Sequence, residues 1–134
     1  MRKTLIAAIA ATMLLGCGKD STGPGDNANP NPDPKHYTIT VQEGDGTTFA
    51  PETTKALVGD VILWTVAKSA TGQHQITFID QPSGVPTPNP SKILVATQSD
   101  SAIFLQHGTY KYQDLMDQSG SADTGIVLIS PLPN

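Results

Sequence analysis

The chain has 134 residues, a formal net charge of −4 at pH 7 and one cysteine, at position 17. Its lysines and arginines form no cluster, so we do not expect a nucleic-acid partner. The length allows one small domain in addition to an N-terminal leader.

The N-terminus has the features of a secretory signal peptide. Arg2 and Lys3 precede an apolar run over about residues 5–15, which is about half of the ~20 residues that a membrane-spanning helix needs. The sequence LLGC at 14–17 then resembles the bacterial lipoprotein box, in which the cysteine becomes the acylated first residue. The alternative is an ordinary signal peptide that ends by chance in a cysteine.

The lipoprotein reading has three consequences. Residues 1–16 are removed, Cys17 carries the lipid, and the protein is held at a membrane of the cell envelope, because several acyl chains anchor a protein stably. Gly18 rather than Asp follows the cysteine, which in a two-membrane bacterium predicts the outer membrane, facing the periplasm or the cell surface. With Cys17 acylated, the folded domain has neither a disulfide nor a thiolate ligand.

Residues 17–35 are expected to form the lipidated cysteine and a disordered tether. Behind the cysteine, this segment is rich in Pro, Gly, Asn and Asp and has no large apolar residue. Such a composition cannot bury enough apolar surface to fold by itself. The remaining residues, 36–134, are expected to form the domain.

The domain shows the alternating pattern of β-strands, and Gly or Pro interrupts every stretch with helical spacing. Strands are predicted at residues 37–42, on both sides of a Gly-Asp turn within 55–66, and at 73–79, 92–98, 101–106, 109–114 and 124–130. The proline-rich segment 81–90 is predicted to be a loop. Short strands separated by turns predict an all-β Greek-key β-sandwich of seven or eight strands, with Trp64 in its core.

The strand at 109–114 ends on a carboxylate. Tyr110, Tyr112 and Asp114 share one phase of the alternation. Because the aromatic phase is expected to face the core, Asp114 should be buried, and Asp117 follows in the next loop. A buried carboxylate must be paired, hydrogen-bonded or bound to a metal.

Four motifs in order resemble the cupredoxins, the plastocyanin and azurin type of blue-copper domain. They are Phe49-Ala50-Pro51, the sequence VGDVILW at 58–64, HQITF at 74–78 and GTYKY at 108–112. The resemblance covers about residues 37–130. It implies a β-sandwich in which a His, a Cys, a second His and a Met hold a type 1 copper ion.

The resemblance also implies that most copper ligands are missing from this chain. His74 falls on the first ligand, Asp114 on the cysteine and Asp117 on the second histidine, while Met116 is out of register with the methionine. A blue-copper site requires the copper–thiolate bond, so no such site is expected.

Two hypotheses remain for His74, Asp114 and Asp117. In the first, they belong to a structural network in which Asp114 accepts hydrogen bonds from His74, from Gln75 or from backbone amides of the loop 115–120. In the second, one imidazole and two carboxylates bind copper or a harder divalent metal such as Mn²⁺, Fe²⁺ or Zn²⁺.

The two hypotheses lead to different functions. The first predicts a binding or accessory module without a cofactor, and the second predicts a metal-binding protein for electron transfer or metal handling. A third reading, a plain immunoglobulin-like adhesion domain, predicts no pocket near His74. No motif places a catalytic nucleophile, so enzymatic activity is not expected. The sequence does not identify a protein or small-molecule partner.

Overall fold

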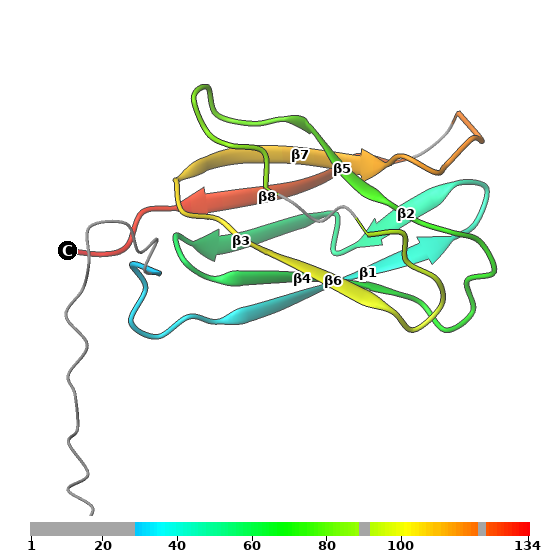
Figure 1. Cartoon of the computed structure of the whole chain (residues 1–134), viewed down its shortest axis with the longest axis horizontal. Coiled ribbons are helices and arrows are strands. Elements are labelled where there is room, and N and C mark those ends of the chain that lie inside the picture. Colours follow the sequence, from blue (N-terminus) through cyan, green and yellow to red (C-terminus); the bar gives the residue numbers. More distant parts are fainter. Residues whose placement is uncertain (1–28, 89–91, 121–122) are drawn as a thin grey trace, which may run out of the picture.

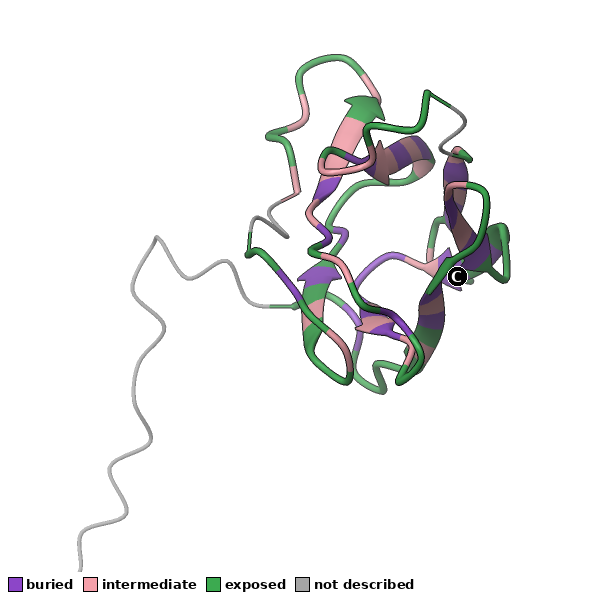
Figure 2. Cartoon of the chain, turned by 90° about the vertical axis from the view of Figure 1, so that its right-hand side faces the viewer, coloured by how far each residue is buried: buried purple, intermediate pink, exposed green. Residues whose placement is uncertain are grey.

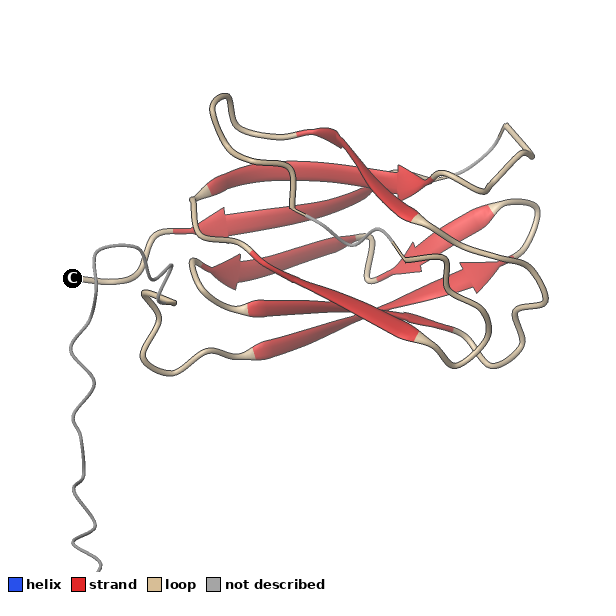
Figure 3. Cartoon of the chain, in the orientation of Figure 1, coloured by secondary structure: helices blue, strands red, loops and turns tan. Residues whose placement is uncertain are grey.

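The structure, a computed structural model, describes residues 29–88, 92–120 and 123–134. The signal peptide 1–16, Cys17 and the tether up to residue 28 lie outside the described residues. The described part is built from strands joined by loops, as Figure 3 shows. Its eight strands are β1 (His36–Glu43), β2 (Thr47–Ala50), β3 (Thr53–Leu57), β4 (Val61–Val66), β5 (Ile76–Asp80), β6 (Ser99–Ile103), β7 (Gly108–Asp114) and β8 (Gly125–Ser130).

The strands form two four-stranded sheets (Figure 1). One sheet has the order β2-β1-β4-β6 and the other β3-β8-β7-β5. In each sheet one neighbouring pair is parallel, β1 with β4 and β3 with β8, and the other pairs are antiparallel. The predicted all-β sandwich is confirmed. The described part of the chain contains no helix long and apolar enough to cross a bilayer.

The core lies between the two sheets because one phase of each long strand is apolar. Figure 2 shows buried and less buried residues alternating along the strands. Trp64 of β4 is fully buried and packs edge-to-face on Tyr112 of β7, with ring centroids 5.3 Å apart. The same aromatic phase of β7 contains Tyr110, whose hydroxyl donates a hydrogen bond to the Gln106 carbonyl at 2.9 Å. Both predictions, the core position of Trp64 and the core-facing phase of β7, are confirmed.

Four details of the strand prediction were wrong. The strand predicted at 101–106 is β6, which begins at Ser99 and ends at Ile103. Residues 92–98 form no strand: Leu94 alone pairs with His74, and a turn follows in which the Gln98 amide bonds the Val95 carbonyl at 2.9 Å. The strand predicted at 73–79 begins only at Ile76, because the backbone of His74 pairs outside the sheet. The short strand β2 was missed.

The described chain begins with a segment that packs on the domain, although the sequence assigns it to the tether. Asn31 is buried, and its side-chain amide donates to Asp60 Oδ1 at 2.8 Å. The same oxygen accepts the Lys35 amide at 2.9 Å, and Asn29 Nδ2 donates to the Gly59 carbonyl at 2.7 Å. Gly59 has φ +86°, and a Cβ at this position would collide with Asn29 and Asn31. The segment before β1 is therefore held against the turn between β3 and β4.

Candidate functional site

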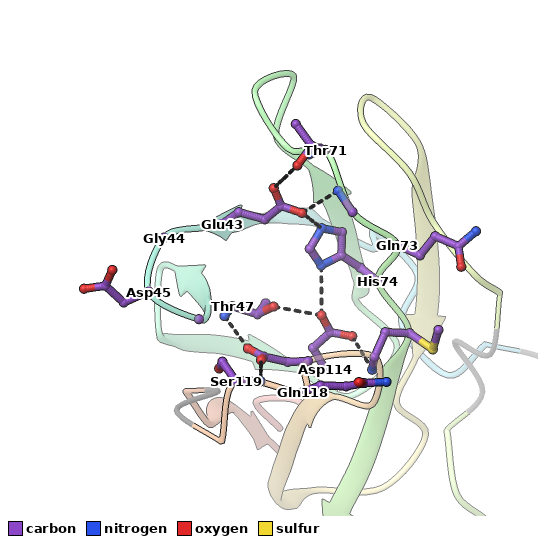
Figure 4. Close-up of a pocket in the computed structure, with 14 residues that line it drawn as sticks. Glu43, Gly44, Asp45, Thr47, Thr71, Gln73, His74, Asp114, Gln118 and Ser119 are labelled. Carbon is purple, nitrogen blue, oxygen red and sulfur yellow. Dashed lines mark hydrogen bonds and ion pairs between the residues drawn. The ribbon is translucent and has the colours of Figure 1, made fainter.

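His74 is placed at one end of the sandwich, immediately before β5. Its backbone N–H and carbonyl both bond Leu94, at 2.9 and 2.8 Å, which fixes the direction of the side chain. The imidazole is only 2 % exposed and lies between the end of β1 and the end of β7 (Figure 4). A polar ring in this position must find its partners within the protein.

Asp114, the last residue of β7, is 3 % exposed and accepts four hydrogen bonds. Its Oδ2 lies 2.8 Å from His74 Nδ1 and 2.8 Å from the Thr47 hydroxyl. Its Oδ1 accepts the backbone amides of Gln75, at 2.8 Å, and Met116, at 3.0 Å. The predicted burial of Asp114 is confirmed, as are its predicted bonds to His74, to Gln75 and to the loop after β7. The carboxylate is fully satisfied.

Glu43, the last residue of β1, faces the other side of His74 and was missed. Its Oε1 lies 3.2 Å from His74 Nε2, close enough for an ion pair. The two atoms are not aligned for a hydrogen bond, and Nε2 has no hydrogen-bond acceptor among the described residues. Glu43 also accepts the amides of Thr71 and Gly72 at 2.8 and 2.6 Å. These two N–H groups lower the pKa of the Glu43 carboxyl. The imidazole is therefore enclosed by two carboxylates.

Asp117 has a different environment, in the loop after β7, where its carboxylate accepts backbone amides. One of its oxygens accepts the Thr47 amide, and the other accepts the Ser119 amide at 2.7 Å. The Ser119 hydroxyl and the amides of Thr47 and Ser119 lower the pKa of Asp117 to about 2, so this carboxylate is ionised at neutral pH. Thr47 links the two acids, because its hydroxyl bonds Asp114 and its amide bonds Asp117.

These side chains line a polar hollow of about 380 Å³. Among the residues that the structure describes, the lining has four carboxylates, those of Glu43, Asp45, Asp114 and Asp117, and no lysine or arginine. Figure 4 shows Glu43, Thr47 and Asp114 arranged around the imidazole of His74. The hollow is acidic, and its deepest groups already bond one another.

The donor set does not fit a blue-copper ion. The folded domain has no thiol, since the chain's single cysteine is at position 17, and the thiolate is the ligand that defines such a centre. His74 Nδ1 and both oxygens of Asp114 are engaged in hydrogen bonds. Among the residues that the structure describes, no group of three or more His, Cys, Asp or Glu side chains is arranged to hold a metal ion.

Comparison with known proteins identifies the fold. No protein-family model and no curated protein sequence matches the chain. Solved structures do match: a purple cupredoxin from Nitrosopumilus maritimus is 22% identical over 69% of this chain and 98% of its own, with a TM-score of 0.54. A plastocyanin from Dryopteris crassirhizoma is 19% identical, covering 70% of this chain and 100% of its own, with a TM-score of 0.56.

A third similar structure is an auracyanin from Roseiflexus castenholzii. It is 14% identical over 72% of this chain and 98% of its own, with a TM-score of 0.53. At these identities the likeness concerns the fold alone. The chain has the cupredoxin fold that its four motifs predict.

Proposed function

We propose that this chain of cupredoxin fold is a lipid-anchored protein of the bacterial cell envelope that serves as a binding or accessory module and has lost the blue-copper site. The signal-like N-terminus and the LLGC sequence at 14–17 support the anchor. The acidic hollow around His74 is a concave surface with convergent polar groups, which supports a binding role.

One observation supports the loss of copper above all others. Asp114, at the position that the resemblance assigns to the copper-binding cysteine, accepts four hydrogen bonds, from His74, Thr47, Gln75 and Met116. A metal ion would have to displace several of these donors and leave them buried without an acceptor, which costs about 1–3 kcal/mol for each group. The network therefore favours the metal-free state.

Metal titration tests this proposal against a metal-binding function through His74, Asp114 and Asp117. We expect the Cys17→Ser mature chain to purify without stoichiometric metal, measured by elemental analysis. Added Cu²⁺ should produce no intense blue absorption, because that band arises from a copper–thiolate bond. A metal ion retained at one per chain in the parent and lost in His74→Ala would contradict the proposal and establish the metal-binding function.

The lipid anchor is tested separately at Cys17. We expect Cys17→Ser to block acylation and signal cleavage, so that the intact mass of the product equals that of the unmodified precursor. The parent should lose residues 1–16, gain the mass of its acyl chains and fractionate with membranes. Ser21→Ala, a change of similar size a few residues away, should behave as the parent does. Equal incorporation of radiolabelled palmitate into Cys17→Ser and the parent would refute acylation at this residue.

A further inference from the structure

A second hollow lies at the end of the sandwich opposite His74. It measures about 480 Å³ and lies between the loop after β5 and the connection from β6 to β7. Its apolar lining includes Val85, Pro86, Pro88, Ile103 and Leu105, and none of the described residues that line it is charged. Ile103 and Leu105 are 48 % and 45 % exposed. An uncharged apolar hollow with two large exposed side chains is a candidate interaction surface.

The N-terminal segment reaches the domain beside this apolar hollow. The Gly59 carbonyl accepts Asn29 Nδ2 at 2.7 Å, and the Gly59 amide donates to the carbonyl of Phe104, a lining residue, at 2.9 Å. Only residues 18–28 separate Asn29 from Cys17. A chain of that length spans at most about 40 Å. A lipid on Cys17 therefore keeps this end of the sandwich near the membrane.

The charge distribution favours the same orientation. The hollow at the His74 end presents the carboxylates of Glu43, Asp45 and Asp117, and the part of its lining that the structure describes has no lysine or arginine. Anionic lipid surfaces attract basic segments and repel acidic ones. The apolar hollow, whose described lining is uncharged, can approach a bilayer without this repulsion. Burying the exposed Ile and Leu side chains at the boundary between headgroups and acyl chains is favourable.

We propose that the apolar hollow with Ile103 and Leu105 docks on the lipid bilayer that holds Cys17, so that the acidic hollow around His74 is directed away from the membrane. The inference rests on the lipid anchor of the proposed function. It adds an orientation, in which the apolar end of the sandwich lies on the membrane and the acidic end is accessible to a soluble or envelope partner.

Fluorescence quenching at two matched positions tests the orientation. The mature chain with Cys17→Ser and an N-terminal hexahistidine tag is held on phosphatidylcholine vesicles that contain a nickel-chelating lipid. Leu105→Cys or Leu115→Cys then supplies the single thiol for an environment-sensitive fluorophore. Leu115 is the matched control, because it is also an exposed leucine, 57 % accessible, but its amide bonds Gln75 at the His74 end.

We expect nitroxide-labelled lipid to quench the fluorophore at position 105 several-fold more than the one at position 115. Adding Ile103→Asp to Leu105→Cys should reduce quenching to the level at position 115. Equal quenching at both positions, or none at either, would overturn the inference. A spectral shift at position 105 that needs no vesicles and grows with protein concentration would also overturn it and would indicate a second copy of the chain as the occupant.

The result is independent of native acylation, because the tag replaces the lipid. If the intact mass of the protein shows no acyl chain on Cys17 while the fluorophore at position 105 is quenched, the lipid anchor is contradicted and the apolar hollow is still a lipid-binding surface. If Cys17 is acylated and position 105 is not quenched, the anchor holds and the docking inference fails.

Discussion

The Asp114→Asn variant is expected to have a free energy of unfolding about 3–5 kcal/mol below that of the parent, because a buried carboxylate that accepts four hydrogen bonds is replaced by a group that accepts fewer. Four donors converge on the carboxylate, from His74, Thr47, Gln75 and Met116. The asparagine amide turns one acceptor oxygen into an NH₂ donor. If the NH₂ group faces Gln75 and Met116, two backbone donors meet a third donor. If it faces His74 and Thr47, the imidazole must change tautomer and the hydroxyl must turn to accept, and the hydrogen bonds to a charged carboxylate are lost.

Asp117→Asn provides the matched control three residues away. Asp117 is half-buried and accepts the amides of Thr47 and Ser119 in the loop after β7, so we expect a loss of only about 1 kcal/mol. Urea unfolding followed by the fluorescence of Trp64, the single tryptophan, measures both variants. Equal losses for Asp114→Asn and Asp117→Asn would show that the buried network does not depend on Asp114.

The Trp64→Ala variant should lose about 3–5 kcal/mol, the usual cost of deleting a large buried aromatic side chain. Trp64 is fully buried in the middle of β4. Its ring packs edge-to-face on Tyr112 and Phe78, with centroids 5.3 and 6.0 Å away. Alanine would leave a cavity between the two sheets and would remove both aromatic contacts.

Circular dichroism follows this unfolding, because the variant lacks its tryptophan. Ile103→Ala is the control: this side chain is also large and apolar and lies in the neighbouring strand β6, but about half of its surface is already in water. We expect Ile103→Ala to lose less than about 1 kcal/mol. A Trp64→Ala protein as stable as Ile103→Ala would show that the core has been misplaced.

The sequence allows the prediction of features that depend on local alternation. The aromatic phase of β7 placed Asp114 in the core, and the cost of burying a carboxylate predicted its bonds to His74 and Gln75. Glu43 continues the phase of Ile39 and Val41, but it lies at the exposed end of β1, so no burial cost predicts its contact with His74.

Other features depend on contacts between distant segments and leave little local signal. The strand β2 has four residues and one large apolar side chain, Phe49, and it forms because it pairs with the end of β1. Conversely, residues 92–98 have the composition of a strand, yet only Leu94 is directed into the core. Asn31 looks like part of a linker until its partner, the buried Asp60, is known.

The position of β8 in its sheet affects when the protein can fold. This strand, the last in the chain, lies between β3 and β7, so that Thr53 pairs with Ile126, far along the chain. Until β8 has been synthesised, β3 lacks its only neighbour in the sheet, and β7 pairs only with β5. Pairing between such distant segments makes folding slow. The sandwich therefore closes only after synthesis has passed residue 130, and until then the chain cannot acquire its final shape.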